Sequence, residues 1–150
     1  MKISDIMTRN PLTCTPETTA AEAAHLMWEA DCGILPVIND DGIDGVVTDR
    51  DLFVALATRN EPASNLRVGA VTTKSIVTCA PDNDVHQALA LMKQERVRRI
   101  PVVGLSGEVL GIVSMNDLVR IADNGGEVTT EQVLDALKAI CAHQPRLVAV

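Results

Sequence analysis

A hydroxyl residue followed three positions later by an aspartate occurs twice in the chain, as Thr48 with Asp51 and as Ser114 with Asp117. Each pair follows an apolar stretch and opens an amphipathic one, so we predict that it stands where a strand passes into a helix. Such a junction presents free backbone N–H groups and the positive end of a helix dipole, which attract anions such as phosphate. The hydroxyl can donate to a phosphate, and an ionised carboxylate can accept from two neighbouring hydroxyls, such as those of a ribose.

An ordinary helix N-cap has the same pattern, and a single copy would favour that simpler interpretation. Two observations favour a ligand site. The pattern occurs at two equivalent positions, and Arg98 and Arg99 precede the second copy. Because a guanidinium can hold a phosphate through paired, charge-assisted hydrogen bonds, these residues indicate a phosphorylated ligand.

The cysteines and histidines, which often perform catalysis or bind metals, do not have the spacing that such sites require. Cysteines recur at equivalent positions of two extended stretches, which is typical of small buried side chains, whereas a reactive thiolate needs an electropositive neighbour. There is no C-x-x-C pair, and the histidines lie far from most cysteines, so the spacing predicts no metal site. We therefore predict a protein that is not an enzyme and whose thiols are reduced. These residues are Cys14, Cys32, Cys79, Cys141, His25, His86 and His143.

Size and charge exclude several classes of partner. With 150 residues, the chain is expected to form one compact unit with a sizeable core. Its 13 basic and 20 acidic residues give a net charge of −7, which disfavours nucleic acid and anionic membranes as partners. One Trp, one Phe and no Tyr cannot form a base-stacking platform. The apolar runs are much shorter than the ~20 residues of a membrane span, and the first residues do not resemble a signal peptide, so we predict a cytoplasmic protein.

The chain contains an internal duplication. At an offset of 65 residues, 10 of the 40 aligned pairs between residues 3–42 and 68–107 are identical. At an offset of 66, residues 45–52 align with 111–118, which brings the two hydroxyl–aspartate pairs into register. The predicted organisation is a first repeat at 1–60, a linker at 61–67, a second repeat at 68–122 and an extension at 123–150.

Each repeat has the same predicted order of elements. A short extended stretch precedes a helix that begins near Thr19 or Asp84, where apolar residues start to recur at helical spacing. Two strands joined by a turn and a second helix follow, and both repeats are expected to share one core. A last helix at about 130–142 has no counterpart in the repeat, and we expect it to pack within the chain. The predicted strands are 34–38, 45–48, 100–103 and 109–113, and the second helices are 49–58 and 115–122.

This ordered pattern resembles the cystathionine-β-synthase (CBS) domain. The first copy comprises Asp5-Ile6-Met7-Thr8-x-x-Pro11, Ile34-Leu35-Pro36-Val37, Gly42-x-x-Gly45 and residues 46–52; the second comprises residues 98–103, Gly107-x-x-x-Gly111 and residues 112–118. The resemblance covers residues 1–122. It implies an α/β (α+β) fold, a tandem CBS-domain pair in which two β-α-β-β-α repeats pack sheet to sheet about a pseudo-twofold axis, often as a dimer of such pairs.

The resemblance also implies two clefts between the repeats that bind adenine nucleotides such as AMP, ADP or ATP. In that family, the hydroxyl–aspartate pair of one repeat holds phosphate and ribose, and the other repeat holds the base. Cleft A would consist of Arg99, Ser114, Asp117, Asn10, Pro11, Cys32 and Gly33. Cleft B would consist of Thr48, Asp51, Ser75, Ile76, Val97 and Arg98. Because Ile34 stands where the second repeat has Arg99, cleft B is expected to lack that cation and to bind phosphorylated ligands less tightly.

Three functions of different classes are compatible with this arrangement. The first is a stand-alone regulatory module that senses an adenine nucleotide and acts on a separate, unidentified protein. The alternative is a homodimeric interaction protein without a physiological nucleotide, and a redox protein that uses the four cysteines is a distant third. We predict a homodimer through the second helices of the repeats, because apolar patches of this kind normally mark an interface. The side chains concerned are Leu52, Phe53, Leu56, Leu118 and Ile121.

Overall fold

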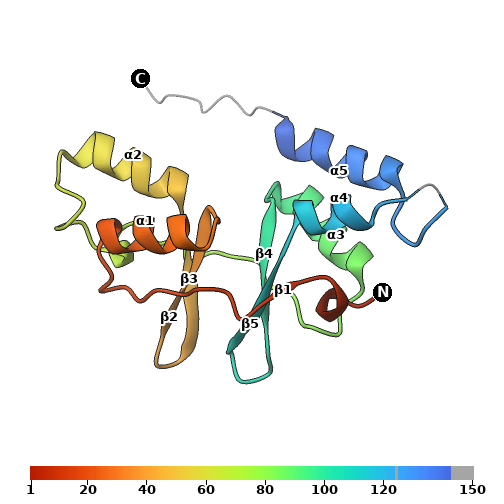
Figure 1. The fold of residues 1–150 in the computed structure, drawn as a ribbon, viewed down its shortest axis with the longest axis horizontal. Coiled ribbons are helices and arrows are strands. Elements are labelled where there is room, and N and C mark those ends of the chain that lie inside the picture. The colour runs from red at the N-terminus through yellow and green to blue at the C-terminus, as the bar shows by residue number, and fades with distance from the viewer. Residues whose placement is uncertain (124, 143–150) are drawn as a thin grey trace.

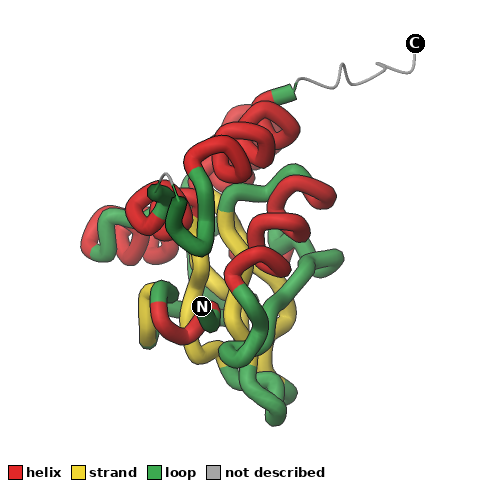
Figure 2. Tube along the Cα trace, turned by 90° about the vertical axis from the view of Figure 1, so that its right-hand side faces the viewer, coloured by secondary structure: helices red, strands yellow, loops and turns green. Residues whose placement is uncertain are grey.

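The two repeats form two similar halves that lie side by side (Figure 1). The computed structural model describes residues 1–123 and 125–142. Figure 2 shows the strands near the centre of the molecule with helices outside them. The first half contains α1 (Ala20–Glu29), β2 (Ile34–Asn39), β3 (Gly42–Thr48) and α2 (Asp49–Arg59); the second contains α3 (Val85–Glu95), β4 (Arg99–Val103), β5 (Val109–Ser114) and α4 (Met115–Ile121), followed by α5 (Thr130–Cys141).

The predicted order of helices and hairpins is confirmed, with boundaries that differ by a few residues. The extended stretches before α1 and α3 are shorter than the resemblance implies, because each makes only a single parallel bridge, from Cys14 to Val37 and from Cys79 to Val102. The neighbouring positions on β2 and β4 are prolines, which have no N–H to extend the ladder.

Each half receives a segment from the other. The strand β1 (Thr8–Arg9) leaves the first repeat and pairs antiparallel with β5 in the second half. Reciprocally, Thr73 of the second repeat exchanges two backbone hydrogen bonds with Val46 on β3, with N–O distances of 2.9 and 3.0 Å. Thr8 and Thr73 are equivalent in the duplication. This reciprocal exchange is the arrangement that a pseudo-twofold axis between the repeats requires.

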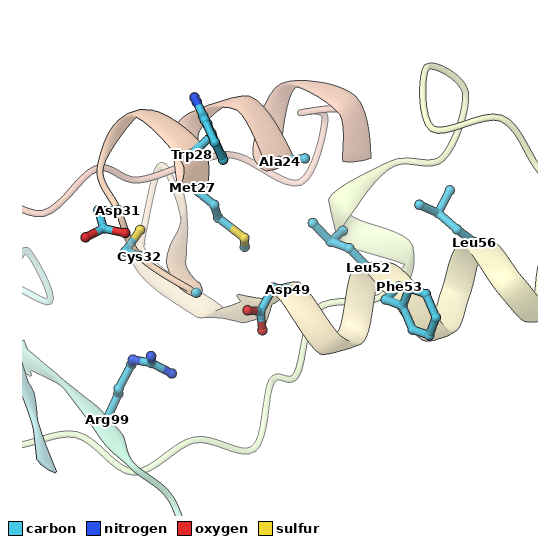
Figure 3. A pocket seen from close by; sticks show the side chains of 11 residues that line it. Ala24, Met27, Trp28, Asp31, Cys32, Asp49, Leu52, Phe53, Leu56 and Arg99 are labelled. Atoms are coloured by element: carbon cyan, nitrogen blue, oxygen red, sulfur yellow. The ribbon is translucent and has the colours of Figure 1, made fainter. Parts of the chain in front are cut away.

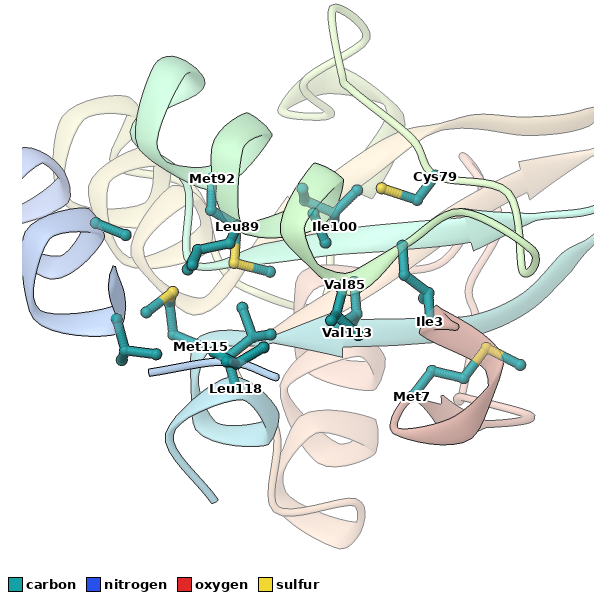
Figure 4. Packing of buried hydrophobic residues seen from close by; sticks show 14 of the residues in the cluster. Ile3, Met7, Cys79, Val85, Leu89, Met92, Ile100, Val113, Met115 and Leu118 are labelled. Atoms are coloured by element: carbon teal, nitrogen blue, oxygen red, sulfur yellow. The ribbon is translucent and has the colours of Figure 1, made fainter. Parts of the chain in front are cut away.

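The exchange divides the apolar interior into two clusters, so the prediction of one shared core is wrong. Ile3 and Met7, from the first repeat, pack into the cluster of the second half (Figure 4). Leu66 and Val68, which lead into the second repeat, pack into the cluster of the first half. Ile3 and Val68 are completely buried. Each core is therefore completed by the chain of the other repeat.

We expect neither isolated half to be stable. A fragment of residues 1–60 lacks Leu66 and Val68, and a fragment of residues 66–123 lacks Ile3 and Met7. Loss of a buried aliphatic side chain costs about 2–5 kcal/mol, which is a large share of the stability of a ~60-residue unit. Each fragment should therefore lack a cooperative thermal transition in calorimetry, whereas the full chain should show one. A cooperative transition in either fragment would contradict this reason for their dependence.

The helix α5 packs within the chain, as predicted, and its partners are α3 and α4 of the second half. Val133 and Ala136 are buried there, and Lys93 of α3 forms an ion pair with Asp135. Cys141, in the last turn of this helix, is exposed. In Figure 1 the C-terminal end of α5 points toward the first half. This added helix therefore belongs to one repeat and reaches toward the boundary with the other.

Candidate functional site

The two hydroxyl–aspartate pairs cap the helices α2 and α4. Asp51 accepts hydrogen bonds from the backbone N–H and the hydroxyl of Thr48 at 2.9 and 2.8 Å, and Thr48 Oγ1 accepts the Asp51 N–H at 3.2 Å. The corresponding distances for Ser114 and Asp117 are 2.8, 2.6 and 3.3 Å. Each carboxylate uses the same oxygen, Oδ2, for both bonds, so the cap leaves Oδ1 for another donor.

The capping geometry alone does not mark a ligand site. Reciprocal boxes of the same kind also begin α1, α3 and α5, through Thr19 with Glu22, Asp84 with Gln87 and Thr129 with Gln132. Backbone and hydroxyl hydrogen bonds from Thr19 lower the pKa of Glu22, as expected for a carboxylate at a helix N-terminus. What distinguishes the pair at α2 is the set of side chains that faces it.

A cavity of about 620 Å³ lies between the two halves beside the Thr48–Asp51 pair. All six residues assigned to cleft B line it. One wall comes from β3 and the start of α2, and the opposite walls come from residues 73–77 and 95–99 of the second repeat. The further lining residues include Val46, Thr73, Val77, Pro101 and Ile140, which the sequence-based assignment missed. We keep the name cleft B for this cavity.

Four arginines line cleft B: Arg50, Arg96, Arg98 and Arg99. Within residues 1–123 and 125–142, none of their guanidinium groups has an ion-pair or hydrogen-bond partner. Arg96 ends α3 in the left-handed conformation, with φ of 56°, and this turn brings the residues after it to the cavity wall. The arginines outnumber the three carboxylates that share the lining, Asp49, Asp51 and Glu95. Cleft B can therefore bind an anion.

Of the seven residues assigned to cleft A, three line a second cavity. Arg99, Cys32 and Gly33 line a groove of about 610 Å³ between α1 and α2, together with apolar side chains such as Met27 and Leu52 (Figure 3). Ser114, Asp117, Asn10 and Pro11 are not part of its lining. Asn10 instead donates its backbone N–H to Leu110 at 3.2 Å beside β5. The assignment of these seven residues to one ligand stays a prediction.

The expectation that cleft B lacks the Arg99 cation is wrong. Arg99 lines both the groove between α1 and α2 and cleft B, where Ile34 is also part of the wall. Sequence alignment of the repeats could not show this, because Arg99 stands at the start of β4 near the boundary between the halves. The substitution at Ile34 is therefore no reason for a weaker cleft B.

Among the described residues, no cysteine or histidine lines cleft B. Burial raises the pKa of Cys14 to about 11 and also raises the pKa of Cys79, so both thiols stay protonated near neutral pH. The Cys32 thiol donates to the Ile34 carbonyl oxygen at 3.4 Å. His25 pairs with Glu29 on the exposed face of α1. His143 lies outside the described residues.

One group of metal-ligand types gathers at the start of α3. Atoms of Asp84, His86 and Glu127 lie within 4.8 Å of one another. They already have partners, because the Met1 ammonium pairs with both carboxylates and His86 Nδ1 lies 2.7 Å from Asp84. The hydrogen bonds from His86 and the N-terminal ammonium lower the pKa of Asp84. This cluster ties the N-terminus to the second half, and we assign it no metal.

Comparison of the sequence with protein families finds the CBS domain twice, at residues 3–58 and 68–124. The uncharacterised protein YlbB of Bacillus subtilis is 36% identical over 93% of this chain and 90% of its own length. The uncharacterised protein MK0525 of Methanopyrus kandleri is 27% identical over 81% of this chain, which spans 62% of that protein. Both matches extend across the two repeats.

Solved structures show the same architecture. The CBS domain pair of MJ0100, in complex with 5-methylthioadenosine and S-adenosyl-L-methionine, has a TM-score of 0.72 and 26% identity over 80% of this chain and 98% of its own. CBSX2 in complex with AMP has a TM-score of 0.68 and 29% identity over 79% of this chain and 93% of its own. Both of those proteins bind adenosyl compounds. Among the described residues, no helix has the length and apolar character needed to cross a bilayer.

Proposed function

Because this chain belongs to the CBS-domain family, as a pair of CBS domains followed by one added helix, we propose that it is a regulatory module that binds an adenine nucleotide in cleft B and acts on a separate protein. In this proposal the module is not an enzyme, it works in the cytoplasm, and its occupied and empty states differ in their interaction with the partner.

The observation that carries this proposal is the composition of cleft B. Guanidinium groups that have no partner among the described residues share one cavity of about 620 Å³ with the N-terminus of α2, and this volume is typical of small-molecule sites. The phosphate would interact with the arginines, and Asp51 would accept from the ribose hydroxyls through Oδ1. The base would lie against Ile76 and Val97. The adenosyl ligands of MJ0100 and CBSX2 support this class of ligand.

A thermal-shift experiment with adenosine, AMP, ADP, ATP and S-adenosylmethionine tests this function. A ligand that binds only the folded state adds about 2.7 kcal/mol at 100 times its Kd, which raises the melting temperature measurably. At least one adenine nucleotide should do so, while GMP at the same concentration should have a smaller effect. If none of the adenosyl compounds shifts the transition, the alternative of an interaction protein without a nucleotide is favoured.

We also propose a homodimer through α2 and α4, with a correction to the side chains involved. Leu52 and Leu118 are buried within the chain, and exposed apolar surface is instead offered by Phe53, Val54 and Val119, with 73%, 45% and 50% of their surface exposed. Because Leu118 is buried, a charged substitution such as Leu118→Glu would disrupt the fold and could not serve as a test of the interface. The two exposed residues Phe53 and Val119 occupy equivalent positions in the duplication.

Phe53→Glu should convert the dimer to monomer at micromolar concentration, because it places a charge in an apolar interface. Sedimentation velocity measures this as a change from twice the 16.0 kDa chain mass to a single chain. Leu105→Glu is the matched control, since Leu105 is fully exposed on the β4–β5 turn. A wild-type protein that sediments as a monomer would sink the dimer proposal.

A further inference from the structure

The helix α5 contributes directly to the wall of cleft B through Ile140. Ile140 stands in the last turn of α5 and is half-buried. It meets the cavity together with residues of β3 and α2 from the first half. The helix α5 is not part of either repeat, yet it lines the candidate ligand site between them.

The two ends of α5 are anchored differently. Its first turns are fixed on α3 and α4 by the buried Val133 and Ala136 and by the Lys93–Asp135 ion pair. In the last turn, Ile140 is half-buried and Cys141 is exposed. Ile140 also packs against the core of the second half, but it is less buried than Val133 and Ala136, so the less buried end of α5 lines the cavity. A molecule in cleft B would add contacts to Ile140, which is only partly buried without it.

A second path joins the cavity to α5 through α3. Glu95 and Arg96, at the C-terminal end of α3, line cleft B, and Lys93, two positions before Glu95, forms the ion pair with Asp135 of α5. A phosphate bound at Arg96 would therefore fix the end of the helix on which α5 rests. Both routes favour the docked position of α5 when the cavity is filled.

We propose that α5 reports the occupancy of cleft B: a nucleotide in the cavity packs against Ile140 and thereby holds the last turns of α5 on α3 and α4. This rests on the proposed nucleotide-binding function. Coupling of this kind is reciprocal. If the nucleotide increases the equilibrium constant for docking of α5 by some factor, docking of α5 must increase the affinity for the nucleotide by the same factor. The exposed face of α5, with Leu134 half-exposed, is then the surface whose order depends on the ligand.

Amide hydrogen exchange with and without saturating AMP, followed by mass spectrometry, tests this coupling. AMP should slow exchange in the last two turns of α5 by roughly threefold or more, beyond any change in α1, which lies away from cleft B. Ile140→Ala should weaken AMP binding by about three- to tenfold and remove the added protection at saturating AMP. Leu134→Ala, on the same helix but outside the cavity lining, should leave both quantities unchanged.

A second variant loosens α5 without touching the cavity. Asp135→Lys breaks the ion pair with Lys93 at an exposed position, so the protein should still fold. It should weaken AMP binding by about two- to fivefold, as reciprocity requires. If calorimetry detects AMP binding that Arg98→Ala weakens, yet Ile140→Ala and Asp135→Lys bind AMP normally and α5 exchange does not change, the coupling is overturned while the function stands. If the wild-type protein binds no AMP, the function itself fails and the coupling with it.

Discussion

Arg99→Ala should weaken binding of AMP and ADP by roughly ten- to a hundredfold while adenosine affinity changes little. A charge-assisted hydrogen bond contributes about 1.5–3 kcal/mol, and adenosine has no phosphate to receive it. Arg99 lines cleft B and has no other side-chain partner among the described residues, so its removal leaves no buried carboxylate unpaired. Calorimetric titration with the three ligands measures the difference directly.

Arg120→Ala is the matched control for this variant. Arg120 is exposed on α4, outside the lining of both cavities, and its removal changes the net charge by the same amount. It should leave all three affinities nearly unchanged. An Arg99→Ala protein that binds AMP as tightly as the wild type would remove Arg99 from the site. Equal losses in the two variants would indicate only a long-range charge effect.

Gly45→Ala should reduce AMP affinity more than tenfold, because the segment that crosses it forms a wall of cleft B. A Cβ at position 45 would lie 2.4 Å from the Thr73 carbonyl oxygen and 2.5 Å from Thr72 Cγ2, so residues 72–77 must shift. Ser75 and Ile76 of that segment line the cavity. Such overpacking typically costs about 1–3 kcal/mol of stability, and the displaced wall adds a loss of affinity.

The pseudosymmetry of the chain supplies the control, Gly111→Ala. Its Cβ would meet Met7 Sδ at 2.6 Å and the Thr8 carbonyl oxygen at 2.8 Å, which displaces β1 from β5. It should lower the melting temperature about as much as Gly45→Ala but leave AMP affinity in cleft B nearly unchanged, since neither β1 nor Gly111 lines that cavity. Similar affinity losses in the two glycine variants would indicate a global effect and would argue against cleft B.

The sequence was sufficient for the order of elements because the duplication repeats every local signal. Thr19 with Glu22 and Asp84 with Gln87 form the capping boxes that begin α1 and α3, and turn residues stand between the strands of each hairpin. Local hydrogen bonds of this kind span three or four residues, so a short window of sequence contains them.

The partition of the core could not be read in the same way. Nothing local to Ile3 or Leu66 indicates that each packs into the other half, because both are simply apolar residues near short turns. The exchange depends on backbone pairing between Thr8 and Ile112 and between Val46 and Thr73, which are far apart in the chain. The glycines at 45 and 111 are the sequence feature that goes with this exchange, because a Cβ there would collide with the segment that crosses from the other repeat. Their role can be recognised only once those crossing segments are known.

The residues of the candidate site were also only partly predictable from the sequence. The six residues of cleft B meet in one cavity, whereas only three of the seven assigned to cleft A line the groove between α1 and α2, although both sets came from the same resemblance. Pseudosymmetry makes the backbones equivalent but not the side chains. Ile140 could not be assigned to the site from the repeats, because α5 has no equivalent in the first half.

A crystal structure of the protein grown with AMP tests most directly whether cleft B is the nucleotide site. We predict density for AMP between the halves, with its phosphate within hydrogen-bond distance of Arg98 or Arg99, its ribose on Asp51 and its base beside Ile76. AMP bound only in the groove between α1 and α2, or crystals with AMP that leave cleft B empty although calorimetry detects binding, would contradict this assignment.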